Sequence, residues 1–246
     1  MNYDPLVDLY EQQYLDYRDD LHFYLRLVDR LGGPVLELGA GTGRLTVPIA
    51  RRGVEIVGLE LSEKMLEKGE AKLGADLPQA QMVQGDMRTF SLNRQFGLIL
   101  IPFNALMHLY TLSDQQKALA NIARHLLPGG SLVFDVYVPK FGLQGVLRHE
   151  GETFYTPDGS RTDVFVLQNV DPIKQVAYTS YFVDTTDILG VLTRGHHVLT
   201  QRYFTRFELE WMLLANGFEI KHLWGSFQME PYTEKSTHMI MQSHLF

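Results

Sequence analysis

Cysteine is absent from this chain of 246 residues. Without thiols there is no disulfide, no cysteine nucleophile and no cysteine-ligated zinc or iron–sulfur site. Basic residues are also sparse, with 22 Lys and Arg against 29 Asp and Glu and a formal net charge of -7. The longest basic run is the pair Arg51 and Arg52. We therefore expect no nucleic-acid partner, because phosphate binding depends on clustered positive charge.

Long apolar runs are missing as well. No stretch approaches the roughly 20 residues that span a bilayer. The first residues, MNYDPLVDLYEQQY, have neither the basic start nor the apolar core of a signal peptide. We expect a cytoplasmic protein with no membrane partner. Internal repeats and low-complexity linkers are absent too, so we expect one domain over residues 1–246, as a monomer or a homodimer.

Strand and helix patterns alternate from Pro34 to about residue 138. We predict strands at 34–39, 54–60, 80–84, 96–101 and 131–137, and helices at 43–52, 62–74 and 113–126. The segment FTRFELEWMLLANGFEI predicts a further helix with Thr205 as N-cap, followed by strands at 218–226 and 236–245. Repeated strand–helix units imply parallel strands. The predicted fold class is α/β, with a doubly wound, seven-stranded, mostly parallel, Rossmann-like sheet.

Two segments lie outside this alternation. Residues 3–31 have apolar and aromatic residues at helical spacing, so we predict two short helices with a break near Asp19 and Asp20, forming a cap over residues 1–31. Residues 139–204 change to β-branched and aromatic runs split by turn signals. We predict an antiparallel β insertion that forms a substrate lid, with about four strands at 152–156, 161–170, 174–184 and 190–201.

The stretch VLELGAGTGRL, residues 35–45, describes a strand that turns tightly into a helix. Gly39, Gly41 and Gly43 alternate, but Arg44 occupies the position of the third glycine of a dinucleotide fingerprint. Glu37 stands at the end of the strand. An acid there suits a ligand that carries an ammonium group better than one that carries two phosphates.

Two more acids follow the next two strands. Glu60 ends the second strand in VGLEL, where a carboxylate can accept both hydroxyls of a ribose. Asp86 in GDMRTF follows the third strand, where it can accept from an adenine amino group while Met87 packs on the ring. The alternative for Asp86 is an ordinary turn or helix-cap aspartate. Because parallel strands end at one edge, we expect the three acids to face the same crevice.

These motifs resemble the class I S-adenosylmethionine (AdoMet) dependent methyltransferases of the small-molecule type. The glycine loop is similar to their motif I, IPFNALMHL follows the fourth strand, and LLPGGSLVFDV matches their fifth strand. The resemblance covers residues 30–138 well and the last helix and two strands loosely. One departure is GLELS, where many members have GIDLS. The resemblance implies AdoMet as cofactor, S-adenosylhomocysteine (AdoHcy) as product and a small-molecule acceptor. The cofactor-binding residues that it implies are Tyr14, Glu37, Gly39, Ala40, Gly41, Gly43, Glu60, Leu61, Gly85, Asp86, Met87, Phe103 and Asn104.

Methyl transfer from a sulfonium is an in-line displacement that needs alignment and exclusion of water more than a strong acid or base. His108 is the candidate base for an acceptor nitrogen or oxygen, the alternative being a histidine that packs beneath the site. The candidate acceptor-binding residues are Tyr17, Tyr178, Arg194 and His196. The pair His196 and His197 faces opposite ways on a strand, so we predict no metal.

Two other functions remain open from the sequence. One is a module that binds AdoMet without turnover, because nothing in the sequence proves that an acceptor is processed. The other is a nicotinamide-dependent oxidoreductase, which Arg44 and the PGG before the fifth strand disfavour.

Overall fold

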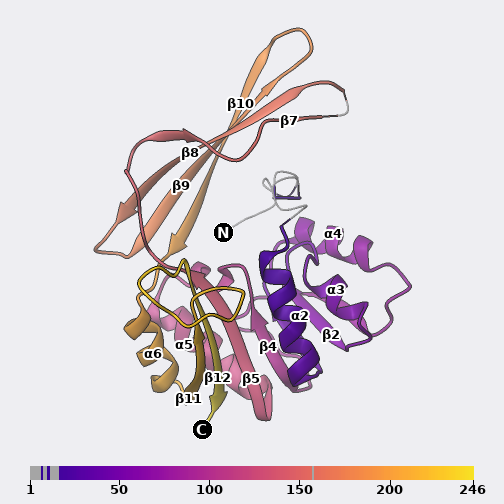
Figure 1. Ribbon diagram of the computed structural model, residues 1–246. Coiled ribbons are helices and arrows are strands. Elements are labelled where there is room, and N and C mark those ends of the chain that lie inside the picture. The colour runs from indigo at the N-terminus through magenta and orange to yellow at the C-terminus, as the bar shows by residue number, and fades with distance from the viewer. Residues whose placement is uncertain (1–6, 8–9, 12–16, 157) are drawn as a thin grey trace. The chain divides into compact units, whose positions relative to one another are not determined.

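The computed structural model of the chain describes residues 7, 10–11, 17–156 and 158–246 (Figure 1). The chain divides into two compact units. The sheet unit comprises Met1–Val138 and Phe204–Phe246, and the insertion unit comprises Pro139–Tyr203. Among the described residues, no helix has the length and apolar character needed to cross a bilayer.

The sheet unit is built on seven strands, in the spatial order β11-β12-β5-β4-β1-β2-β3. Their bounds are β1 Val35–Leu38, β2 Ile56–Glu60, β3 Ala80–Gln84, β4 Phe96–Ile101, β5 Leu126–Tyr137, β11 Phe218–Trp224 and β12 His238–Leu245. All neighbours are parallel except β12, which runs antiparallel to both β5 and β11. The predicted fold class is confirmed. Because the strand order reverses between β1 and β4, ligands of such sheets bind beyond the carboxyl ends of these two strands.

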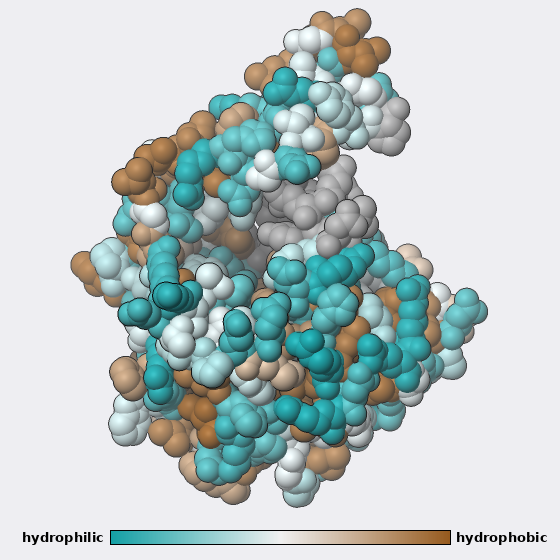
Figure 2. All heavy atoms as spheres, viewed as in Figure 1, coloured by the Kyte–Doolittle hydropathy of each residue, from teal (hydrophilic) through white to brown (hydrophobic). Residues whose placement is uncertain are grey.

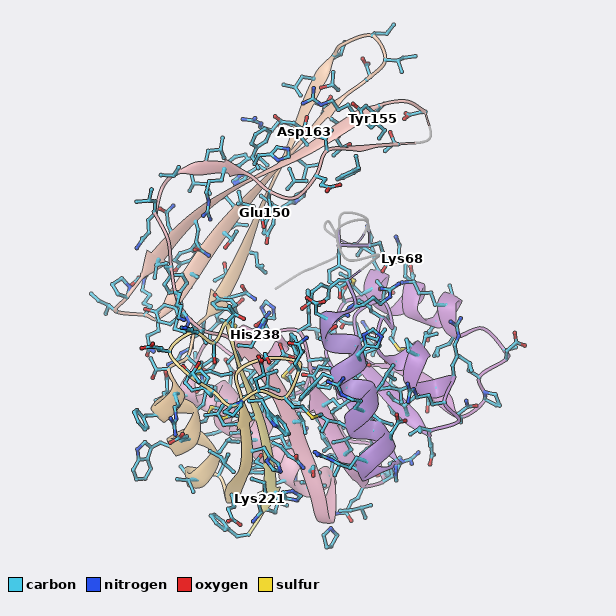
Figure 3. All side chains as sticks on the ribbon, in the orientation of Figure 1. Lys68, Glu150, Tyr155, Asp163, Lys221 and His238 are labelled. Carbon is cyan, nitrogen blue, oxygen red and sulfur yellow. The ribbon has the colours of Figure 1, made fainter. Side chains whose placement is uncertain are left out.

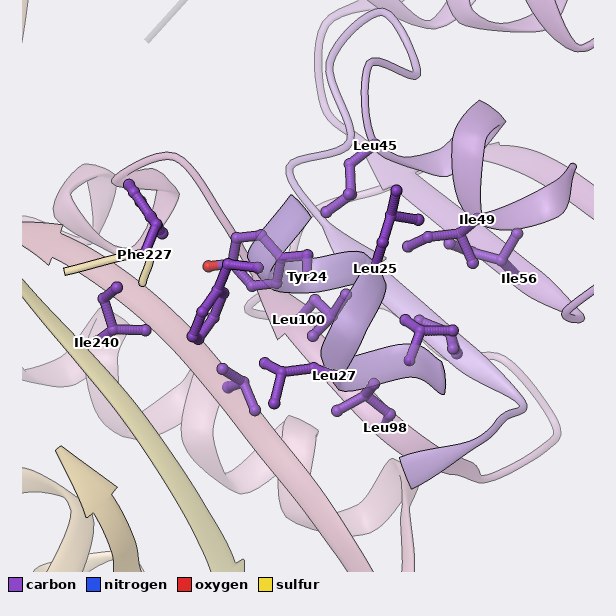
Figure 4. Packing of buried hydrophobic residues seen from close by; sticks show 14 of the residues in the cluster. Tyr24, Leu25, Leu27, Leu45, Ile49, Ile56, Leu98, Leu100, Phe227 and Ile240 are labelled. Carbon is purple, nitrogen blue, oxygen red and sulfur yellow. The ribbon is translucent and has the colours of Figure 1, made fainter. Parts of the chain in front are cut away.

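Helices cover both faces of this sheet. They are α2 Asp19–Leu31, α3 Thr46–Ala50, α4 Glu63–Leu73, α5 Leu112–His125 and α6 Arg206–Ala215, with a 3-10 helix, η2, at Ala105–His108. Figure 1 shows α2 in front of the sheet and α5 behind it. The buried residues of α2 recur at helical spacing and pack on β4 residues such as Leu98 and Leu100 (Figure 4). Each large apolar side chain buried in this way contributes about 1.5–3 kcal/mol.

The insertion unit is a separate antiparallel sheet with strands in the order β10-β9-β8-β6, and β7 also pairs with β8. The bounds are β6 Leu147–His149, β7 Phe154–Tyr155, β8 Arg161–Asp171, β9 Val176–Thr186 and β10 Leu192–Arg202. Figure 3 labels Asp163, a buried acid on β8. The turn between β9 and β10 exposes apolar side chains, including Leu189 at 83% (Figure 2). The antiparallel character is confirmed, and the role as a lid stays a prediction.

The element boundaries differ from prediction at several points. The helix predicted at 43–52 forms only over Thr46–Ala50, because Gly43 still belongs to the bend with a φ of 75°. The break predicted near Asp19 and Asp20 agrees with the non-helical residues 17 and 18, after which α2 begins at Asp19; most of the residues before them lie outside the described part. The helix predicted at 113–126 begins one residue earlier, at Leu112, and Thr111 caps it, since its side chain accepts from Asp114 N.

Two strand predictions were wrong in extent. The segment LLPGG, which precedes the strand predicted at 131–137, lies within β5 as a bulge. Leu126 pairs with Phe96 and Ser131 with Leu98, and Gly129 has a φ of 77°. Within its described residues, the insertion has five strands rather than about four. The extra strand, β6, has three residues that are all exposed, so no apolar alternation marked it.

Candidate functional site

The glycine bend between β1 and α3 presents bare backbone at the carboxyl edge of the sheet. Gly39, Gly41 and Gly43 have φ values of 78°, 56° and 75°. A side chain is disfavoured at such angles, which explains the alternation of glycine in the sequence. The N–H groups of Gly39 and Ala40 donate to Leu59 O at 2.8 and 3.0 Å. The bend is therefore folded back on the end of β2.

The carboxylate of Glu60 is anchored by backbone N–H groups. Its Oε2 accepts from Gly41 N at 2.7 Å, and its Oε1 accepts from Leu61 N at 2.9 Å and Ser62 N at 2.8 Å. Ser62 also caps α4, so the carboxylate joins the glycine bend to the N-terminus of that helix. Charge-assisted bonds of this kind are about twice as strong as neutral ones. Glu60 is therefore rigidly oriented at the edge where it was predicted.

Gly69 on α4 is a residue of the site that the sequence reasoning missed. A Cβ at Gly69 would lie 2.6 Å from Met82 Cε, 3.3 Å from the carbonyl carbon of Thr42 and 3.4 Å from Gly41 O. The absence of a side chain therefore lets α4 approach the backbone of the glycine bend closely. The only sequence signal was a glycine inside a helical pattern, which usually has a packing reason.

Glu37 lies beneath the bend and is 2% exposed. Its Oε2 accepts a hydrogen bond from Thr46 Oγ1 at 2.5 Å. Burial raises the pKa of Glu37 to about 8, and the charges of Asp20 and Glu60 act in the same direction. The folded protein therefore keeps this carboxyl group protonated at neutral pH.

Asp86 and its neighbours lie beyond β3. Gly85 N donates to Glu60 O at 2.9 Å, which places this segment beside the end of β2. Both oxygens of Asp86 accept from the Arg88 side chain, and Arg88 also pairs with Asp114 at 3.0 Å. The Arg88 guanidinium lowers the pKa of Asp86. Asp86 thus has a structural partner of its own, while Met87 is half-buried beside it.

Arg44 and Asp20 form a buried ion pair next to the bend. The two terminal nitrogens of Arg44 donate to the two oxygens of Asp20 at 2.7 and 2.6 Å, and the Asp20 side chain is 1% exposed. The guanidinium carbon lies 4.9 Å from the ring centroid of Phe103 and 5.4 Å from that of Tyr17. In the sequence, Arg44 stood out only as a departure from a nucleotide motif, and no role was predicted for Asp20.

The predicted acceptor-binding residues fall in both units. Tyr17 lies in the sheet unit, and burial raises its pKa. In the insertion unit, Arg194 pairs with Asp184 at 2.6 Å and His196 stacks on Phe182 with ring centroids 4.6 Å apart. The strand register places Tyr178, which lies opposite Thr200, on the same face as these two side chains. These three residues therefore share one surface of the insertion sheet.

His108 ends η2 and is half-buried, with its ring 6.5 Å from that of Tyr110. Tyr14 lies outside the described residues. Within the part of the chain that the structure describes, no group of three or more His, Asp or Glu side chains could hold a metal ion.

Comparisons with known proteins identify the family. Residues 35–130 match a family model described as a methyltransferase domain. The chain is 31% identical over 203 residues to dTDP-3-amino-3,4,6-trideoxy-alpha-D-glucopyranose N,N-dimethyltransferase of Streptomyces venezuelae, covering 78% of this chain and 77% of that protein. This chain belongs to the class I AdoMet-dependent methyltransferases. AdoMet is accordingly its cofactor.

Two other relatives are similar over most of their length. Cypemycin N-terminal methyltransferase of a Streptomyces species is 29% identical over 212 residues, covering 85% of this chain and 82% of that protein. The AdoMet-bound structure of CalS10, an amino pentose methyltransferase from Micromonospora echinaspora, matches with a TM-score of 0.75 at 23% identity, covering 95% of this methyltransferase and 96% of that chain.

The residues at the carboxyl edge fit an AdoMet molecule. The bend is open at Gly41, where the nearest atom to an added Cβ would be Tyr10 Oη at 3.9 Å. Glu60 supplies an oriented acceptor beside it, and Leu61 exposes 52% of an apolar side chain next to that acceptor. The Glu60 carboxylate can match the polar edge of a nucleoside, and the Leu61 side chain can match the apolar face of its base.

Proposed function

We propose that this methyltransferase transfers the methyl group of AdoMet to a nitrogen or oxygen atom of a small organic molecule. The observation that carries the proposal is the contact of the glycine bend with Glu60, at 2.7 Å from Gly41 N, at the edge where the strand order reverses. When bound, AdoMet supplies an electrophilic methyl group on a positively charged sulfur. The protein has to hold the donor and the acceptor in line and exclude water.

We assign the donor-binding roles to residues of the sheet unit. Glu60 would accept from the ribose hydroxyls, and Leu61 would pack against the adenine ring. Asp86 would accept from the adenine amino group, in competition with Arg88, which already engages both of its oxygens. The backbone from Gly39 to Gly41 would contact the methionine part.

We assign acceptor recognition to the insertion face that contains Tyr178, Arg194 and His196. Aromatic and imidazole rings beside an anchored guanidinium suit a small polar molecule held by stacking and a few hydrogen bonds. One relative is named as an N,N-dimethyltransferase of a dTDP-linked 3-amino sugar and another as an N-terminal methyltransferase, which supports a nitrogen acceptor. His108 would remove a proton from the acceptor where the acceptor carries one.

Ligand-induced stabilisation tests the donor part of this proposal. A ligand at 100 times its Kd stabilises the native state by about 2.7 kcal/mol. For a chain of this size, that corresponds to a rise in Tm of about 5–10 °C. We expect this rise with AdoMet and AdoHcy and none with NAD. Turnover of AdoMet against a panel of amines and hydroxyl compounds then tests the acceptor class, and activity on neither group would refute it.

A further inference from the structure

Asp135 is a buried acid on β5 that the proposed chemistry does not use. It is 1% exposed, in a stretch of the strand, residues 131–136, that is buried throughout. Burying a carboxylate in this way is unfavourable unless hydrogen-bond donors offset the loss of water. Asp135 has three such donors. Its Oδ1 accepts from Phe103 N at 2.9 Å and from the Tyr24 hydroxyl, and its Oδ2 accepts from Asn104 N at 3.2 Å.

The two backbone donors belong to a strained turn after β4. Phe103 and Asn104 have φ values of 55° and 62°. A residue with a side chain pays about 1–2 kcal/mol for this left-handed conformation. A second contact also ties the turn to β5, because Asn104 Oδ1 accepts from Tyr137 N at 2.7 Å. The strained conformation therefore depends on two positions of β5, 135 and 137.

This turn lies against the glycine bend. A Cβ added to Gly39 would lie 3.0 Å from the Cβ of Ala105, the residue that follows the turn. The ring of Phe103 lies 5.7 Å from the Tyr17 ring in an edge-on contact and packs on the Arg44 guanidinium. The conformation at positions 103 and 104 thus sets both the distance to the bend and the place of an aromatic ring beside it.

We propose that Asp135, held by the Tyr24 hydroxyl, is a positioning residue of the methyl-donor site that fixes the left-handed turn Phe103–Asn104 against the glycine bend. This inference rests on the proposed function, because the turn matters for the donor only if the bend holds AdoMet. Asp135 acts through the turn and is not a catalytic residue.

Conservative variants of Asp135 and Tyr24 remove their hydrogen bonds and leave the packing around them in place. Asn at position 135 keeps one acceptor oxygen but turns an amide N–H toward a backbone N–H, so one anchor of the turn is lost. Phe at position 24 keeps the ring in its fully buried place and removes only the hydroxyl. Ile240 lies directly opposite Asp135 on β12 and provides a matched control. Ile240→Val changes the packing beside Asp135 and leaves the turn's hydrogen bonds in place.

The experiment is calorimetric titration of the full-length protein with AdoHcy at pH 7.5, with Tm measured for every variant. We expect Asp135→Asn to weaken AdoHcy binding about tenfold or more, and Tyr24→Phe about threefold. Ile240→Val should bind AdoHcy with an affinity within twofold of that of the wild type, even if its Tm is lower. The double variant Tyr24→Phe with Asp135→Asn should bind no more weakly than Asp135→Asn alone, since both changes act on one network.

The pH dependence of AdoHcy affinity is a second measurement, and a purely structural role of Asp135 would not change it. Burial raises the pKa of Asp135 to about 6, with the charge of Asp20 acting in the same direction. The other groups coupled to this cluster are Tyr17, Tyr24, Glu37 and Arg44 from the neighbouring segments, and His238 through Asp20. We expect AdoHcy affinity of the wild type to fall as the pH drops through about 6, because a protonated Asp135 loses acceptor capacity. Asp135→Asn should lack this dependence.

The outcomes separate the inference from the proposed function. A wild type that does not bind AdoHcy overturns the proposed function, and this inference with it. A wild type that binds, together with an Asp135→Asn variant of equal affinity and equal pH dependence, overturns the positioning role alone. If Asp135→Asn does not fold, Tyr24→Phe decides, and wild-type affinity with an unchanged pH profile in that variant refutes the inference.

Discussion

The buried carboxyl group of Glu37 makes a sharp prediction about stability and pH. Glu37 is protonated in the folded protein up to a pKa of about 8, whereas its ordinary pKa is 4.5. The unfolded chain therefore loses this proton first as the pH rises. Its contribution to stability is fully present below pH 4.5 and is lost as the pH rises through about 8.

The magnitude follows from the difference in pKa. Each pKa unit corresponds to about 1.4 kcal/mol, so a difference of about 3.5 amounts to about 5 kcal/mol over the whole range. Between pH 5 and pH 8 the expected loss is about 3–4 kcal/mol. Glutamine at this position is neutral at every pH and can still accept from Thr46. The Glu37→Gln variant should therefore gain about 3–4 kcal/mol relative to the wild type between pH 5 and pH 8.

The assay is urea unfolding of both proteins at pH 5, 6, 7 and 8, with the two free energies of unfolding subtracted at each pH. Subtraction removes the contributions of the titrating groups that do not interact with Glu37. A flat difference between Glu37→Gln and the wild type across this pH range would refute the reasoning, because Glu37 would then titrate alike in the folded and unfolded chain.

Three further predictions concern the donor site and its frame. Glu60→Gln should weaken AdoHcy binding at least tenfold, as measured by calorimetry. An amide supplies one acceptor oxygen, whereas the carboxylate accepts from three N–H groups with two. Unchanged affinity would contradict the ribose role of Glu60. Gly69→Ala should cost about 1 kcal/mol in urea unfolding and also weaken AdoHcy binding, since its Cβ would lie 3.3 Å from the carbonyl carbon of Thr42 and 3.4 Å from Gly41 O in the backbone of the bend. A variant with normal affinity would show that the close approach is irrelevant to the ligand. Thr205→Ala should cost about 1 kcal/mol by removing the capping box with Glu208, and leave AdoHcy affinity unchanged.

The parallel sheet could be predicted because its signals are local. The strand at 96–101 is a largely buried apolar run, whereas the edge strand at 80–84 buries only Met82, and both were predicted with their observed bounds. The glycine bend and Glu60 were found for the same reason, since residues close in sequence bring them together. The helix after the bend was overestimated because left-handed glycines delay its start.

The parts that the sequence did not reveal depend on contacts between distant segments. Asp135 is separated from its partner Tyr24 by 111 positions, and from Phe103 by 32. Its only local signal was one acid inside an apolar strand. Arg44 and Asp20 come from different elements, and no spacing rule relates them. Asp86 is a different case. Its partner Arg88 is only two residues away, yet the sequence did not indicate that Arg88 would engage both oxygens of Asp86.

The strand pairing of the insertion makes this unit exchangeable between relatives. Among the described residues, the strands β6 to β10 pair only within their own sheet. The insertion unit begins after Val138 and ends before Phe204, where the chain returns to the sheet unit. Mutations in β6 to β10 need not disturb the register of the seven-stranded sheet. Exchanging residues 139–203 between relatives would therefore replace the insertion unit while conserving the sheet unit, and divergence by recombination could use the same two junctions.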